Sequence, residues 1–143
     1  MCSAVKGAAA EAAVLAAFVE RGFDVLIPFG AGQPYDLVVD LRGTFIRVQC
    51  KTAWPSAGCM LFNSRTTDHG RGQRSYAGLA DIFGVYFPPT RTVYLVPIST
   101  VPGRQGRLRL EPAQNNQRRR IRLAAELGID HWTAEALQRV AAA

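Results

Sequence analysis

The sequence has 143 residues, of which 48% are hydrophobic, which is enough for one domain with a buried core and too many for a largely disordered chain. No apolar run approaches the roughly 20 residues that cross a bilayer, so we expect no membrane-spanning helix. The formal net charge of +6 fits a polyanionic partner, and it fits a merely solubilising surface equally well.

The cysteines and the alanine-rich start of the sequence bear on the cellular setting. Cys2, Cys50 and Cys59 are odd in number and lack the spacing of metal ligands, which favours a reduced, cytoplasmic protein. The alanine-rich start resembles a signal peptide, but Glu11 interrupts it and a single lysine is a poor positively charged leader. We therefore expect an amphipathic helix there.

The first third of the sequence predicts one helix and three strands. The predicted helix covers residues 3–22, and the predicted strands cover 22–29, 35–41 and 44–52. Gly22 stands where a helix usually stops. The last two strands are joined tightly at Arg42 and Gly43, so they form a hairpin.

Beyond the hairpin, the alternation of apolar and polar residues is lost. Residues 54–75 are predicted as a long loop with room for a short strand at 60–62. The remaining predicted elements are strands at 81–87 and 92–98, a helix at 112–127, and a short last helix with Thr133 as its N-cap. The chain, 1–143, is thus predicted to be a single α/β domain, a mixed β-sheet with flanking helices in the order α-β-β-β-loop-β-β-α.

Glu11 falls on or beside the apolar stripe of the first helix. Val14, Leu15 and Phe18 follow it at helical spacing, on the face that should pack against the sheet. A carboxylate buried there without a partner would be strongly destabilising. The alternative is that Glu11 lies at the edge of the stripe and reaches water.

The register of the hairpin follows from its tight turn. A two-residue turn places Leu41 opposite Thr44 and Asp36 opposite Gln49, with Lys51 diagonal to Asp36. Because alternate residues share a face of a strand, a carboxylate, an amide and an ammonium should converge on one face. If the first helix packs over that face, its glutamate joins them.

This cluster predicts either a metal site or a polar, solvated sheet face with a routine Asp–Lys contact. The second interpretation leaves Glu11 unexplained. Oxygen ligands suit Mg²⁺, which in hydrolysis can polarise a phosphoryl oxygen and lower the pKa of an attacking water. Lys51 would place positive charge against the developing negative charge or orient that water. Gln49 and Lys51 are therefore predicted to form one wall of a phosphodiester-cleaving site.

Four motifs, in this order, resemble those of the PD-(D/E)xK nuclease superfamily, and within it the small nucleases related to a group I intron homing endonuclease. The motifs are KGxxxE at 6–11, PYDLVVD at 34–40, RVQCKTA at 47–53 and YAGLADIFGVY at 76–86. Each motif alone is weak, but the ordered set over the first two-thirds of the chain is fairly specific.

The resemblance implies a metal-dependent DNA endonuclease with a three-layered, restriction-endonuclease-like α/β core. The family pattern assigns catalysis to Glu11, Asp36, Gln49 and Lys51. It assigns metal binding to Glu11, Asp36 and the main-chain carbonyl of Cys50. The implied cofactor is Mg²⁺, for which Mn²⁺ can substitute, and the implied partner is double-stranded DNA.

Two residues depart from the family pattern. Tyr35 precedes Asp36 where the family has proline. Gln49 stands where most of the superfamily has an acidic residue, although the intron-endonuclease branch also carries glutamine. An amide oxygen holds a cation less strongly than a carboxylate, so weaker metal affinity or fewer bound ions are expected.

Arginines in two segments are candidates for DNA contact. The candidates are Arg65, Arg71, Arg74 and Tyr76 around the long loop, and Arg118 and Arg122 on one face of the predicted helix 112–127. A solvated surface would explain the same residues. A homo-oligomer, a dimer or a tetramer, is expected because one small core offers limited contact with DNA and symmetry would supply two sites for two strands.

Two other functions fit the same motifs. One is a Holliday junction resolvase-like nuclease, whose family shares the fold, and which would prefer a four-way junction to a linear duplex. The other is a catalytically inactive DNA-binding module of the nuclease fold, for which Gln49 is the best support. The inactive module would bind DNA in a salt-sensitive way and would not nick it at any metal concentration.

Overall fold

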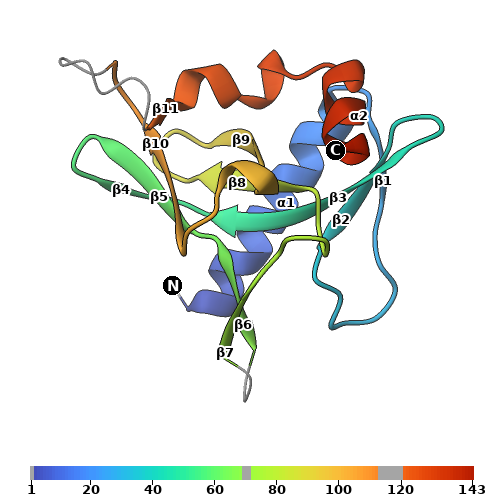
Figure 1. Cartoon of the computed structure of the whole chain (residues 1–143), viewed down its shortest axis with the longest axis horizontal. Helices are drawn as coiled ribbons and strands as arrows, with labels where there is room; N and C mark the ends of the chain where they lie inside the picture. The colour runs from blue at the N-terminus through green and yellow to red at the C-terminus, as the bar shows by residue number, and fades with distance from the viewer. Residues whose placement is uncertain (1, 69–71, 113–120) are drawn as a thin grey trace.

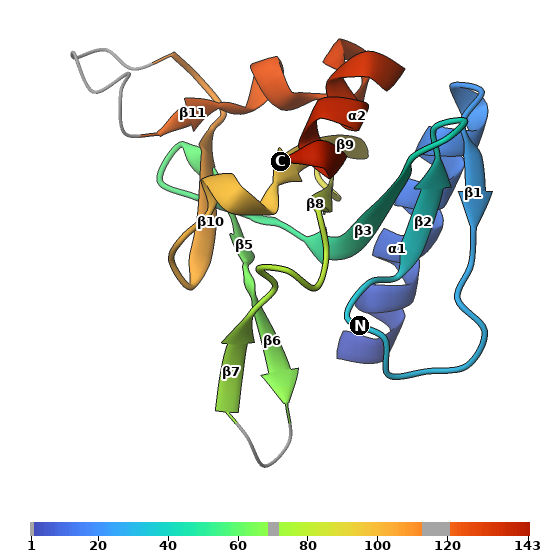
Figure 2. The same cartoon turned by 45° about the vertical axis from the view of Figure 1, so that its right-hand side comes forward.

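The computed structural model describes residues 2–68, 72–112 and 121–143 (Figures 1 and 2). The helices are α1 (Ser3–Glu20) and α2 (Ala134–Ala142). The strands are β1 (Asp24–Leu26), β2 (Leu37–Asp40), β3 (Phe45–Thr52), β4 (Trp54–Ser56), β5 (Cys59–Asn63), β6 (Arg65–Asp68), β7 (Gly72–Ser75), β8 (Ile82–Phe87), β9 (Thr92–Pro97), β10 (Gln105–Arg109) and β11 (Arg122–Leu123). Short 3₁₀ turns cover Ile98–Thr100, Ala124–Leu127 and Ile129–His131.

The central element is a mixed five-stranded sheet in the order β1-β2-β3-β8-β9. β3 and β8 are parallel, and the other neighbours are antiparallel. α1 lies across one face of this sheet, and α2 packs against β3 (Figure 1). The predicted class, an α/β fold with a mixed sheet and flanking helices, is confirmed.

A second sheet, in the order β11-β10-β5-β4, covers much of the opposite face of the five-stranded sheet. Met60 and Phe62 of β5 and Leu108 of β10 pack there with Phe83 and Val85 of β8. This cluster forms a second hydrophobic core. β6 and β7 pair with each other alone and project from the body of the molecule as a hairpin (Figure 2).

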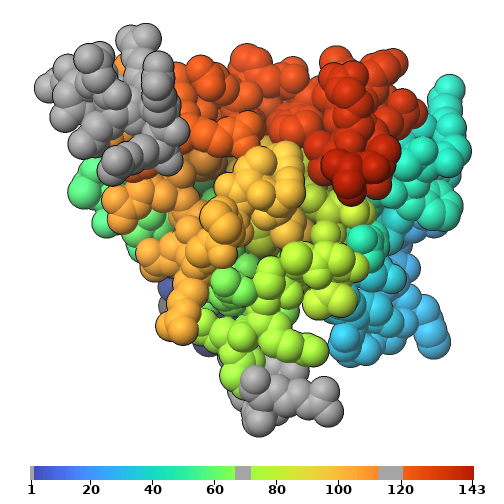
Figure 3. Space-filling view, in the orientation of Figure 1, coloured from blue at the N-terminus to red at the C-terminus, as the bar shows by residue number. Residues whose placement is uncertain are grey.

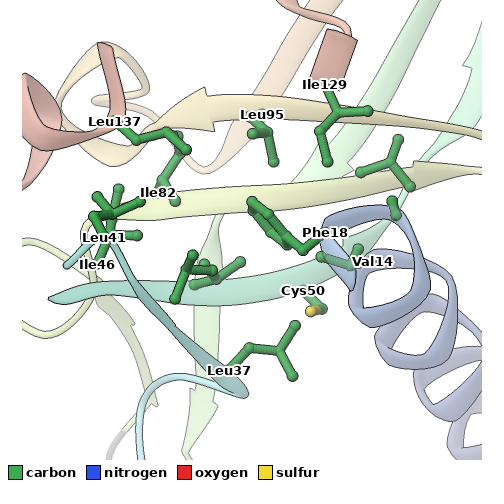
Figure 4. Packing of buried hydrophobic residues seen from close by; sticks show 14 residues of the cluster. Val14, Phe18, Leu37, Leu41, Ile46, Cys50, Ile82, Leu95, Ile129 and Leu137 are labelled. Atoms are coloured by element: carbon green, nitrogen blue, oxygen red, sulfur yellow. The ribbon is translucent and has the colours of Figure 1, made fainter. Parts of the chain in front are cut away.

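α1 forms as its apolar stripe requires. Val14 and Phe18 are fully buried in the core between the helix and the sheet (Figure 4). The helix ends where Gly22 adopts a positive φ of 84° and the Phe23 N–H donates to the Phe18 carbonyl at 3.1 Å. This Schellman ending satisfies the last carbonyls of the helix. The predicted stop at Gly22 is confirmed.

The hairpin of β2 and β3 has the predicted register. Asp40 pairs with Phe45, and the Leu41 N–H donates to the Thr44 carbonyl at 2.8 Å. Residues 42 and 43 both have positive φ, 61° and 119°, as a type I′ turn requires. This register ends at Leu37, because the Asp36 N–H donates to the carbonyl of Val48, the partner of Leu37, at 2.8 Å, so the predicted pairing of Asp36 with Gln49 is not formed.

The first helix does not cover the face of Gln49 and Lys51, which was the condition under which Glu11 would join them there. α1 packs on the other face of β3, where Val14 and Phe18 lie in one buried cluster with Ile46 and Cys50 (Figure 4). The reason is the alternation within β3 itself. Its buried side chains all point to one face, and the apolar stripe of the helix packs against that face rather than against the polar one.

Gly84 of β8 lets α1 approach the sheet closely. A Cβ atom built at this glycine would lie 2.7 Å from Val14 Cγ1 and 3.1 Å from Val48 Cγ1. Neither valine has a long flexible side chain that could move aside. Gly84, the second glycine of the YAGLADIFGVY motif, therefore determines how closely α1 packs against the sheet.

Gly84→Ala is expected to lower the free energy of unfolding by about 1–3 kcal/mol, the usual cost of overpacking a core. Urea unfolding measures this change. The control is Gly7→Ala on the same helix, where an added Cβ meets nothing within 4 Å and should stabilise the helix by up to about 1 kcal/mol. Equal stability of the two variants would contradict the close approach.

The predicted loop at 54–75 is wrong, since it contains β4 to β7. The expected short strand at 60–62 exists as β5, and it lies between β10 and β4. Both faces of β5 are covered, so four of its five residues are buried and no period-two pattern appears. β7 is exposed along its whole length, which explains why its residues are polar.

The predicted helix at 112–127 is also wrong over its described part. Residues 122–123 pair with β10 in parallel as β11, and a 3₁₀ turn follows with Ala124 and Leu127 buried. Pairing with the edge of the second sheet overrides the local helix preference here. The last helix is confirmed, since the Thr133 hydroxyl accepts the Ala136 N–H at 3.1 Å as an N-cap. Neither α1 nor α2, the helices of the described residues, is long and apolar enough to cross a membrane.

Candidate active site

Asp36 lies where β3 runs past the start of β2. Its N–H donates to the Val48 carbonyl at 2.8 Å, and its side-chain Oδ2 accepts the Cys50 N–H at 2.8 Å. The ladder of β2 with β3 ends at Leu37 and Val48, so no main-chain carbonyl of β2 accepts the Cys50 N–H. The Asp36 carboxylate accepts it instead. This bond fixes Asp36 at the point where the two strands separate.

Glu11 meets Asp36 at this point. Glu11 is exposed and lies beside the buried stripe of α1. From the face that the helix covers, its side chain reaches Asp36, just before the start of β2. Partial burial, followed by the charge of Asp36 and a hydrogen bond with it, raises the pKa of Glu11 above its usual value. Two carboxylates this close hold a proton between them or attract a cation.

Cys50 contributes its main chain rather than its thiol. Burial, and then the charges of Asp36 and Glu11, raise the pKa of the thiol, which is therefore neutral and a poor ligand. Along a strand, main-chain groups two residues apart point to the same edge. The Val48 carbonyl points toward β2, so the Cys50 carbonyl faces the same edge, beside the Asp36 carboxylate.

Lys51 points to the opposite face of β3 and is largely buried. Its Nζ donates to the Tyr76 hydroxyl at 3.0 Å and to the Arg65 carbonyl at 3.3 Å, and it lies 4.7 Å from the centroid of the Tyr76 ring. Burial lowers the pKa of Lys51 to about 8, although the charge of Asp36 acts to raise it. The ammonium is thus near enough to Asp36 to feel its charge.

The lowered pKa of Lys51 predicts a pH dependence of stability. Between pH 8 and 10.5 the unfolded chain holds more proton on this lysine than the folded chain does. In EDTA, the free energy of unfolding of the natural chain minus that of Lys51→Met should therefore rise across this window. Urea unfolding of both chains below, within and above this pH window measures the difference in free energy of unfolding. A difference that does not change with pH would contradict the burial of the Lys51 charge.

Gln49 lies beside the cluster, half-buried on the face of Lys51. Its Nε2 donates to the Cys50 carbonyl at 3.4 Å, so the amide lies next to that main-chain oxygen. The four predicted catalytic residues therefore come from both faces of the sheet. They meet only because the strands separate at Asp36.

The candidate DNA-contacting residues are not gathered on one surface. Arg65 and Arg74 lie on β6 and β7; Arg65 donates from Nη2 to the Pro102 carbonyl at 3.2 Å, and Arg74 is exposed. Arg122 lies on β11, away from this hairpin in both views (Figures 1 and 2). Arg71 and Arg118 lie outside the described residues.

Tyr76 is not on the surface where a DNA contact would require it. It is 5% exposed, and its ring packs edge-on against Phe83 at 5.6 Å. Its contact with Lys51 was not predicted. Nothing in the local pattern could have revealed it, since the two residues are 25 positions apart and on different elements.

Arg47 and Asp81 form a second polar pair that the sequence analysis did not single out. Asp81 accepts from the Arg47 N–H at 2.7 Å and from Nε and Nη2 at 3.1 Å. These bonds tie the start of β8 to the middle of β3. They fix the strand that carries Gln49 and Lys51, without reaching the carboxylates.

The oxygen atoms around Asp36 suit a hard divalent cation. Within 2–68, 72–112 and 121–143, no group of three or more His, Cys, Asp or Glu side chains is placed to hold a metal ion. A cation here would depend on Glu11, Asp36, the Cys50 carbonyl and water. Such a set, with few carboxylates and several waters, is typical of Mg²⁺.

Comparisons with known proteins bear on the same features. A sequence model described as "PD-(D/E)XK endonuclease" matches residues 1–130. Among solved structures, the chain is similar to a bacterial homing endonuclease, I-Ssp6803I, with a TM-score of 0.70 and 23% identity over 99% of this chain and 95% of that one. At this identity the likeness supports the fold. No curated protein sequence gives a significant match.

Proposed function

Because this chain belongs to the PD-(D/E)XK endonuclease family, as its four motifs predicted, we propose that it cleaves duplex DNA with Mg²⁺, for which Mn²⁺ can substitute. The observation that carries the proposal is the meeting of Glu11 and Asp36 beside the Cys50 carbonyl. Two facing carboxylates, neither of which forms an ion pair within the described residues, are costly unless a proton or a cation is shared.

Glu11, Asp36 and the Cys50 carbonyl would hold the metal, with Gln49 in support. A bound Mg²⁺ would supply polarisation of a phosphoryl oxygen and a more acidic water. Asp36 has a second role in keeping the end of β3 in place through the Cys50 N–H. The neutral amide of Gln49 fits a site of lower charge and therefore of lower metal affinity.

Lys51 would stabilise the negative charge that develops on phosphate oxygens. Its ammonium is held by neutral oxygen atoms and a ring rather than by a close carboxylate, so its positive charge is not neutralised locally. In a partly buried site such a charge acts more strongly than it would in water.

The β6–β7 hairpin and residues 27–36 flank the candidate site, and a notch separates them (Figure 3). Arg74 on the hairpin would contact the DNA backbone. A symmetric dimer or tetramer would present two such sites to the two strands. Light scattering of the purified protein tests the assembly.

Cleavage of supercoiled plasmid, with Mg²⁺ and with EDTA, tests the function. We expect nicked and linear products only with the metal. A four-way junction and a linear duplex of the same sequence separate a resolvase from a duplex endonuclease. Salt-sensitive binding without nicking at any Mg²⁺ or Mn²⁺ concentration would instead support an inactive binding module.

Metal binding should also be visible without DNA. We expect Mg²⁺ to raise the melting temperature of the natural chain in a concentration-dependent way, because a ligand that binds only the folded state stabilises it. Glu11→Gln should weaken this rise, since it removes one ligand charge. Glu20→Gln, an exposed glutamate at the other end of α1, is the control. A rise of equal size in both variants would exclude Glu11 as a ligand.

A further inference from the structure

The ammonium of Lys51 is held by the base of the β6–β7 hairpin. Arg65, the first residue of β6, offers its carbonyl at 3.3 Å, and Tyr76, directly after β7, offers its hydroxyl at 3.0 Å. Arg65 and Ser75 are paired in the ladder of the hairpin. Arg65 and Tyr76, one at each end of the hairpin, therefore hold the lysine ammonium together and are called the clamp below.

The clamp is anchored in the second core. Tyr76 is 5% exposed, and its ring stands edge-on to Phe83, which is itself edge-on to Phe62 at 5.4 Å between centroids. The ring cannot swing away without disturbing this aromatic stack. Lys51, by contrast, is a flexible side chain that would otherwise sample several rotamers.

We propose that Tyr76 is a positioning residue, whose hydroxyl and ring hold Nζ of Lys51 in the orientation needed for phosphodiester cleavage. The inference rests on the proposed function of Lys51. It also gives the hairpin a second role, because the segment that carries Arg74 is the segment that fixes the lysine. A shift of the hairpin on a substrate would move the ammonium with it.

The competing explanation is that Tyr76 only fills the core. The two explanations differ in whether the Tyr76 hydroxyl group is needed for activity. A core tyrosine changed to phenylalanine keeps its ring and its packing, whereas a positioning tyrosine loses the acceptor that orients Nζ.

Tyr76→Phe is the test, with Tyr94→Phe as its matched control. Tyr94 is buried in the same cluster but lies on β9, two strands away from Lys51. In Mg²⁺-dependent nicking of supercoiled plasmid, Tyr76→Phe should lower kcat at least about tenfold with KM unchanged, since a hydrogen bond to a charged group is lost. The control should keep both constants.

A second measurement is independent of activity. The chain has two lysines, Lys6 and Lys51, so the side-chain ammonium groups of a ¹⁵N-lysine sample give two NMR signals below the pKa of both. In the natural chain and in the control, the Lys51 signal should show restricted motion and slow exchange with water, and Lys6 should not. In Tyr76→Phe, the Lys51 signal should broaden or approach that of Lys6.

Each outcome bears on the proposal separately. An unchanged Lys51 signal in Tyr76→Phe overturns the clamp, whether or not the chain cuts DNA. A released Lys51 with an unchanged kcat overturns the positioning role. If the natural chain has no nuclease activity, the proposed function fails, and the NMR comparison still decides whether the clamp exists.

Discussion

Asp36→Asn is expected to abolish Mg²⁺-dependent cleavage, with a fall in kcat of at least about 10³-fold, because it removes a ligand charge from the reacting centre. The amide oxygen can still accept the Cys50 N–H, so the junction of β2 and β3 should survive. Plasmid nicking measures the loss, and urea unfolding shows that the variant is folded.

Asp40→Asn is the matched control for this change. Asp40 is the last residue of β2, whose first residue directly follows Asp36, and its Oδ1 accepts the Arg42 N–H in the hairpin turn. An asparagine can make the same bond. Activity that is lost equally in both variants would show that Asp36 matters for the hairpin rather than for the chemistry.

Lys51→Met is expected to lower kcat by about 10²–10³-fold, the usual cost of removing one charge-stabilising group. At neutral pH it should also raise the free energy of unfolding, because methionine fills a similar volume and removes a buried charge whose pKa is lowered to about 8. Loss of activity together with a gain in stability cannot be explained by misfolding.

Lys6→Met is the control for Lys51→Met, since it removes the same charge from an exposed position near the start of α1. Activity should remain, and stability should change little. Full activity in Lys51→Met would show that the lysine has no role in cleavage. Tyr76 would then have no catalytic group to position.

The parts of the candidate site that could be predicted are those set by short-range geometry. The Arg42–Gly43 turn fixed the pairing of β2 with β3, and the helical spacing placed Glu11 beside the apolar stripe. Both follow from backbone periods that hold over a few residues. The order of the motifs then indicated the family, which the match over residues 1–130 confirms.

Glu11 was expected to join Gln49 and Lys51 if the first helix packed over their face. The helix packs on the other face, because its apolar stripe packs against the apolar side of β3. Glu11 still reaches Asp36 because that residue sits at the end of β2, where side chains from both faces can meet.

Local sequence was enough to predict the amphipathic α1, the register of the β2–β3 ladder and the N-cap at Thr133, because each depends on residues close in the chain. Three features depend on tertiary packing: the strands within 54–75, the pairing of residues 122–123 with β10, and the contacts of Lys51 with Arg65 and Tyr76. β5 finds its main partner in β10, where Gly106 makes room for the Phe62 ring. Such pairings depend on distant segments that bury each other, and no local period in the sequence records them.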